Sequence, residues 1–163
     1  FNGNPEPKEI DRILKTIELP YPLGLAEKGG LLTASPVFAS DKSLRKTLDR
    51  NAYHGTLVWS WQMALMEKGL EKQIKRFAKE PGRKKMVKRM YGALSKLKKM
   101  EKEAGELINS ELWTHKMMNG KMKPYPYGAD ASSETESNPV QLWSTVGPST
   151  AMGFAEATEM MKK

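Results

Sequence analysis

Two long helix-forming stretches joined by a Pro-Gly pair are the feature that most limits the folds open to this chain. In the second stretch, residues 83–109, apolar residues recur at a period of about 3.6 and basic residues occupy the opposite face. The first stretch begins after Gly55 or Thr56, with Thr56 as the expected N-cap, and runs to about Glu80. Because Pro81-Gly82 breaks the helix between them, we expect an antiparallel helical hairpin.

The remaining segments are expected to be helices and long ordered loops. Apolar spacing predicts a helix over Pro7–Glu18, with Pro7 in its first turn. Residues 20–52 form an irregular connection with a short helix near Ser43–Leu48. Residues 110–139 are expected to be a loop, and a last helix follows from Asn138-Pro139 toward Met161. No segment alternates apolar and polar residues as a half-buried strand does, so we predict an all-α fold.

Length and composition indicate a single globular piece. The 163 residues are 39% hydrophobic and 28% charged, values typical of one folded domain. The absence of cysteine excludes disulfides, thiolate metal ligands and thiol nucleophiles. No apolar run reaches about 18 residues, so no membrane span is expected. Because the chain begins with Phe1, we expect a processed or truncated product; its compartment stays open, with a secreted or periplasmic location favoured.

The net charge of +8 comes from one helical region. Residues 72–102 hold thirteen Lys and Arg, opposed there only by Glu80 and Glu101. A basic patch of this kind suggests a helical nucleic-acid-binding module. Lysines opposite an apolar stripe are more often a solvated helix face, so nucleic acid is not the expected partner.

Aromatic and acidic residues in the loops are the candidates for chemistry. His54 and His115 lack metal-ligand spacing, so we predict no metal site, and no Gly-rich fingerprint indicates a cofactor. Aromatic rings are good platforms for the apolar faces of sugars, although plain core packing explains many aromatics equally well. The carboxylates that could act as acid or base are Glu111, Glu134 and Glu136.

Two motifs in the chain resemble a glycosidase family. The first is Tyr53-His54-Gly55 followed by Val58-Trp59-Ser60-Trp61. The second combines Glu111-Leu112-Trp113, Pro126-Tyr127-Gly128 and the run from Asn138 to Ser144. Together they resemble amylo-α-1,6-glucosidase and glycogen-debranching-type enzymes, which are six-hairpin glycosidases built as an (α/α)6 toroid. The chain departs from that pattern at Ser60, where the family often has proline, and in a longer closing loop.

The resemblance implies part of an inverting α-glycosidase that acts on oligo- or polysaccharide. It implies Glu111 as the general base, with Glu134 or Glu136 as the alternatives. The family's general acid lies upstream of the first motif, and this chain has no counterpart. The resemblance therefore implies the C-terminal portion of a partial (α/α)6 toroid over residues 1–163, with the remainder in the same precursor or in a second chain. The residues implied to line the sugar site are Tyr53, His54, Trp59, Trp61, Trp113 and Gln141. A non-catalytic carbohydrate-binding or scaffold subunit is the other reading of the same fold.

Overall fold

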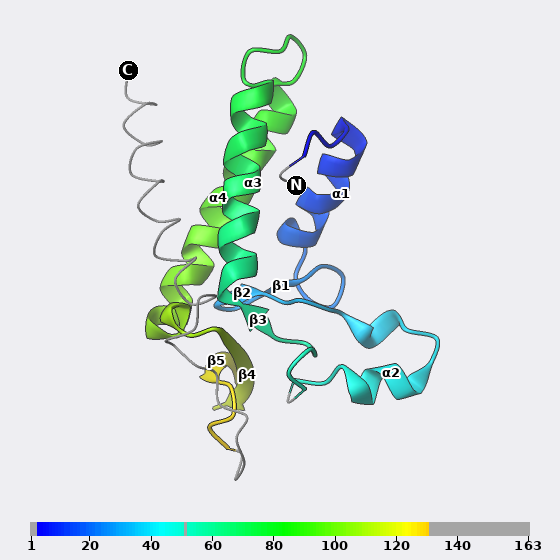
Figure 1. Cartoon of the computed structure of the whole chain (residues 1–163), viewed down its shortest axis with the longest axis vertical. Coiled ribbons are helices and arrows are strands. Elements are labelled where there is room, and N and C mark those ends of the chain that lie inside the picture. Colours follow the sequence, from blue (N-terminus) through cyan, green and yellow to red (C-terminus); the bar gives the residue numbers. More distant parts are fainter. Residues whose placement is uncertain (1–2, 51, 131–163) are drawn as a thin grey trace.

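The computed structural model describes residues 3–50 and 52–130, which form a mixed α/β structure. Three helices run side by side above a small antiparallel sheet, as Figure 1 shows. They are α1 (Pro7–Glu18), α3 (Ser60–Phe77) and α4 (Lys84–Ala104). Short strands lie at one end of these helices, and a loop carrying η1 (Pro36–Phe38) and α2 (Lys42–Thr47) extends away from them. The expected all-α toroid architecture is therefore wrong for this chain.

Five strands in two antiparallel sheets overturn that prediction. A two-stranded sheet pairs β1 (Ala26–Glu27) with β2 (Gly30–Leu31). A second sheet has the strand order β3 (Val58–Trp59), β4 (Leu112–Met118) and β5 (Lys121–Pro126). Residues 112–126, expected to be a loop, are thus a β-hairpin joined at Asn119-Gly120. Both turn residues have positive φ, 51° and 70°, as a two-residue hairpin turn with an Asn-Gly pair requires.

The burial pattern of β4 explains why its sequence did not indicate a strand. Its first four residues, from Leu112 to His115, are all buried, and the rest are exposed. The two faces of its first half pack against different groups of side chains, so the alternation expected of a half-buried strand is absent. The local evidence that remained was Asn119-Gly120, a strong hairpin signal in its own right.

The helical predictions are confirmed with shifted ends. α1 has the expected bounds, and a capping box between Glu6 and Glu9 fixes its start. The α3–α4 hairpin forms, but α3 begins at Ser60, directly after the strand residues Val58 and Trp59. Thr56 caps no helix and instead donates its hydroxyl hydrogen to the Leu48 carbonyl at 2.6 Å. α4 stops at Ala104, where Gly105 adopts a φ of 61°, and the 3₁₀ turn η2 (Gly105–Asn109) follows. The helix predicted from Asn138 lies outside the described residues.

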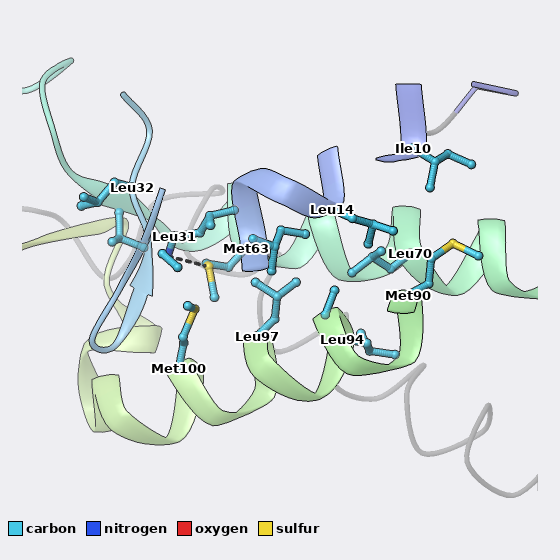
Figure 2. Packing of buried hydrophobic residues seen from close by; sticks show 14 of the residues in the cluster. Ile10, Leu14, Leu31, Leu32, Met63, Leu70, Met90, Leu94, Leu97 and Met100 are labelled. Atoms are coloured by element: carbon cyan, nitrogen blue, oxygen red, sulfur yellow. Dashed lines mark hydrogen bonds between the residues drawn. The ribbon is translucent and has the colours of Figure 1, made fainter. Parts of the chain in front are cut away.

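The main core lies where α1 and the β1–β2 turn pack against the α3–α4 hairpin. Figure 2 shows Leu14 of α1 near Leu70 of α3, and Leu31 of β2 near Met63; Leu97 of α4 belongs to the same core. The backbone N–H of Leu31 points to the Met63 sulfur at 3.3 Å. These side chains are buried, and apolar burial of this kind is the main driving force for folding. No helix in the described part of the chain is long and apolar enough to cross a membrane.

Ion pairs between helices neutralise part of the positive charge of α4. Arg89 of α4 binds Asp11 and Glu18 of α1, and its Nη2 lies 2.8 Å from a Glu18 oxygen. Lys98 of α4 contacts Glu67 of α3, whose side chain is 0% exposed, and also Glu101 at 2.9 Å. The two acids that oppose Arg89 thus come from another helix, which a window of sequence around α4 cannot reveal.

Glu67 makes the stability of the fold depend on pH. Burial raises the pKa of Glu67 from 4.5 to about 8, although the hydrogen bond from Lys98 opposes the shift. The folded chain therefore holds an extra proton between these values, and the free energy of unfolding falls as the pH rises through that window. Glu67→Gln removes the titrating group, so the variant should lose this slope in urea unfolding measured from about pH 5 to about pH 8. Glu80→Gln, at an exposed pair with Arg83, is the control, and parallel profiles for the wild type and Glu67→Gln would contradict the assignment.

Candidate functional site

A hydrogen bond joins two residues that lie 58 positions apart, Tyr53 and Glu111. Tyr53 belongs to the loop before β3, and Glu111 lies between η2 and β4. The Tyr53 hydroxyl donates to the Glu111 carboxylate, with 2.5 Å between the two oxygens. The backbone of Glu111 is also fixed, because both the N–H and the hydroxyl of Ser60 donate to its carbonyl at 3.0 Å. The first residue of α3 therefore holds the segment that carries the carboxylate.

The surroundings of this pair keep the phenol protonated. The pKa of Tyr53 rises from 10.0 to about 12, first because of burial of the hydroxyl end and then because of the hydrogen bond and the negative charge of Glu111. A phenol is protonated at neutral pH in any case, and the raised pKa of Tyr53 extends its role as a hydrogen-bond donor to alkaline pH. Glu111 is only 1% exposed, whereas Tyr53 as a residue is 41% exposed. The Tyr53 ring is thus exposed to solvent on one side and hydrogen-bonded to the buried Glu111 carboxylate on the other.

Aromatic rings surround Tyr53; we call Tyr53, His54, Trp59, Trp61 and Tyr127 the Tyr53 cluster. Tyr53 meets Trp59 edge to face, with ring centres 5.0 Å apart, and reaches Tyr127 at 6.2 Å. His54 stacks on Trp59 at 5.9 Å with 12° between the ring planes. Trp61 lies edge to face with Trp59 at 6.1 Å. Trp59 and Tyr127 are buried while Tyr53 and His54 are exposed, so the cluster runs from the core to the surface.

Gly55 fixes the path of the loop that carries Tyr53 and His54. A Cβ atom at this position would lie 1.9 Å from the carbonyl oxygen of Asp49, which no side chain tolerates. The Gly55 N–H donates to the Ala52 carbonyl at 2.8 Å and closes a tight turn. The glycine is therefore required by close backbone packing, and the turn places Tyr53 next to β3.

The structure brings four of the predicted site aromatics together with Glu111 and places one elsewhere. Trp113 is 0% exposed in the main core, where its indole N–H donates to the Gly29 carbonyl at 3.0 Å. Its neighbour Leu112 projects into the other group of side chains, with Trp59 and Tyr127. Tyr127 belongs to the cluster although sequence reasoning gave it no role, and its place in the motif Pro126-Tyr127-Gly128 was the available signal. Gln141, Glu134 and Glu136 lie outside the described residues.

His115, the second histidine, is part of the fold and not of the Tyr53 cluster. Its Nε2 lies 2.6 Å from the Lys28 carbonyl, which fastens β4 to the β1–β2 turn. Burial lowers the pKa of His115, so the ring is neutral near pH 7. Within residues 3–50 and 52–130, no group of three or more His, Cys, Asp or Glu side chains is arranged to hold a metal ion.

The chemical capacity of the site follows from these contacts. It offers a buried carboxylate with a fixed hydrogen-bond donor, flanked by aromatic faces that reach the surface. Comparisons of the chain with protein-family models, with curated proteins and with solved structures give no match.

Proposed function

We propose that the Tyr53 cluster is a carbohydrate site and that Glu111 is the general base of an inverting α-glycosidase reaction. The observation that carries the proposal is the hydrogen bond between Tyr53 and Glu111 beneath aromatic rings. The resemblance of residues 53–61 and 111–113 to amylo-α-1,6-glucosidases points to the same two segments. The two segments lie 58 positions apart in the sequence and are joined by this hydrogen bond, which supports the proposal independently of the motif spacing.

The geometry suits the chemistry of a sugar. Aromatic rings present an apolar face with a negative quadrupole, on which the polarised C–H groups of a sugar ring can pack. A carboxylate beside that platform can take a proton from water as the water attacks the anomeric carbon. The phenol of Tyr53 orients the carboxylate by donating a hydrogen bond to it. Because the phenol stays protonated, it does not accept the proton that the carboxylate takes from water.

Inversion requires a second carboxyl group on the other side of the glycosidic bond. The two groups of an inverting glycosidase lie about 6.5–9.5 Å apart, with room for the attacking water between them. The proposal assigns this general acid to another part of a longer precursor or to a second chain. The present chain would contribute the base and one aromatic wall.

A carbohydrate-binding role without hydrolysis is the second candidate. It is favoured by the burial of Glu111, whose side chain is only 1% exposed, because a general base must meet water during the reaction. In this case the Tyr53–Glu111 hydrogen bond would serve to hold the exposed ring in place. The two candidates share the sugar platform and differ only in whether turnover occurs.

Sugar binding is tested by titrating the protein with α-1,4- and α-1,6-linked glucose oligosaccharides and following tryptophan fluorescence. Trp61→Ala removes one ring of the Tyr53 cluster and is expected to weaken binding by about 1 kcal/mol, roughly fivefold in Kd. Phe38→Ala is the matched control, since Phe38 is a more exposed aromatic residue outside the cluster. Absence of binding to every oligosaccharide in the panel would overturn both candidates.

Tyr53→Phe then separates the two candidates. Hydrolysis should fall roughly 10- to 150-fold at unchanged Kd if the phenol orients a working base, since a hydrogen bond to a charged group contributes about 1.5–3 kcal/mol. Tyr125→Phe is a matched control, because it removes an equivalent hydroxyl-to-carboxylate bond, to Asp130 at 3.0 Å, on the surface. Binding with no detectable turnover by the wild type, in the presence of any partner chain, would favour the second candidate.

A further inference from the structure

A groove of about 520 Å³ runs along α4 beside the end of α1, far from the Tyr53 cluster in sequence. Glu18 of α1 forms one wall. The rest of the lining comes from one face of α4, at Lys85, Lys88, Arg89, Gly92, Ala93 and Lys96. Residues three and four apart share a helix face, so these positions form a continuous stripe. From Lys85 to Lys96 the stripe is about 16 Å long, which is three helical turns.

The floor of the groove is small and open. At Gly92 no atom lies within 4 Å of the position that a Cβ would occupy. A glycine inside a helix costs about 0.5–1 kcal/mol relative to alanine, and the fold of the described residues does not require one here. The neighbouring Ala93 is buried and apolar. Another backbone could therefore approach α4 closely at this point.

The rim of the groove is positively charged. Lys85 and Lys88 are exposed and form no ion pair within residues 3–50 and 52–130. Lys96 donates to the Glu18 carbonyl at 2.8 Å and keeps its charge at the edge. Arg89 is neutralised by Asp11 and Glu18, so it fixes the wall and adds little charge. The lysine stems extend the apolar surface while their ammonium groups stay in solvent.

We propose that this groove is a docking site for an acidic amphipathic helix of a partner protein. The open surface at Gly92, together with the lysine stems beside it, would receive the apolar residues of that helix, spaced three and four apart. The ammonium groups of Lys85, Lys88 and Lys96 would face glutamates or aspartates on either side of that apolar stripe. This proposal stands apart from the carbohydrate function and does not depend on it.

A helix fits the groove better than nucleic acid does. A phosphate backbone gains most from unpaired cations, and Arg89 is already bound to two carboxylates. No aromatic side chain lines the groove, so a base would find no ring on which to stack. An apolar floor at a glycine matches close helix packing instead.

The probe is a fluorescently labelled peptide of about 20 residues with a leucine stripe flanked by glutamates, stabilised as a helix. A counterpart carries lysines in place of the glutamates. Fluorescence anisotropy should show binding of the glutamate peptide and at least tenfold weaker binding of the lysine peptide. The double variant Lys85→Glu/Lys88→Glu should reverse this preference. Lys75→Glu/Lys79→Glu, at one exposed lysine in the last turn of α3 and one just after it, makes the same change of net charge and should leave the preference unchanged.

Gly92→Leu tests the groove separately from its charge. The leucine side chain would occupy the open floor, so binding of the glutamate peptide should fall at least tenfold while urea unfolding shows an intact fold. Unchanged binding in Gly92→Leu would overturn the proposal. Equal losses in the two double lysine variants would overturn it as well. So would tighter binding of a DNA duplex of about 20 base pairs than of the peptide, since that outcome assigns the stripe to nucleic acid.

Discussion

If Glu111 is the proposed general base, its replacement by glutamine is expected to lower hydrolysis of glucose oligosaccharides by about 10²–10⁴-fold, the usual contribution of general acid–base catalysis. Glutamine has nearly the same shape, and its side-chain carbonyl can still accept the hydrogen bond from Tyr53. The fold and the sugar platform should therefore persist, and Kd should stay nearly constant. What disappears is the ability to take a proton from water. The measurement is kcat and Kd for the same oligosaccharide with the protein and any chain that completes its site.

The matched control is Glu106→Gln, the same chemical change at an exposed residue of η2. It should leave both constants unchanged. Near-normal turnover of Glu111→Gln would move the base to Glu134 or Glu136, which are then tested by the same substitution. Loss of binding together with turnover would instead indicate that Glu111 contacts the sugar or holds the loop.

Trp113→Ala should give the largest loss of stability, about 3–5 kcal/mol in the free energy of unfolding. Its side chain is 0% exposed and packs in the main core, and its indole N–H satisfies the Gly29 carbonyl. Removing the ring leaves a cavity and an unpaired carbonyl, and both changes lower the free energy of unfolding. Urea unfolding monitored by circular dichroism measures the change.

Trp113→Phe keeps most of the apolar volume and removes the N–H, so a loss of about 1–3 kcal/mol is expected, and this variant remains folded for binding assays. Its affinity for sugar should equal that of the wild type. Trp61→Ala is the converse control, with a small effect on stability and a measurable effect on Kd. Weakened sugar binding by a folded Trp113→Phe protein would instead indicate that Trp113 contributes to the sugar site.

The parts of the fold that the sequence predicts are those with a repeating local pattern. α1 and the α3–α4 hairpin have apolar stripes of helical period, and Pro81-Gly82 marks the turn between them. The sheet could not be predicted in this way, because β3 has two residues and β4 is buried on both faces at its start. β3 joins this sheet only through pairing between residues far apart in the sequence, such as Val58 with Trp113. The Asn119-Gly120 turn was the one local sign of it.

The candidate site shows the same division. Tyr53, His54, Trp59 and Trp61 were found together because they are neighbours in the sequence. Sequence reasoning reached Glu111 through the resemblance, but its hydrogen bond to Tyr53 depends on how β4 pairs with β3. Trp113 was assigned to the sugar site as the aromatic residue of the Glu111-Leu112-Trp113 motif. Successive residues of a strand point to opposite sides, which separates Leu112 from Trp113.

β4 packs against two separate groups of side chains, the main core through Trp113 and the group of Trp59 and Tyr127 through Leu112. A change that shifts this strand reaches the packing of the helices and the aromatic cluster at the same time. The loop that carries Tyr53 and His54 does not contact both groups of side chains in this way, since both residues are exposed and neither belongs to the main core. Substitutions of Tyr53 or His54 are therefore expected to leave the helical core intact, whereas substitutions in β4 affect the helical core and the Tyr53 cluster together.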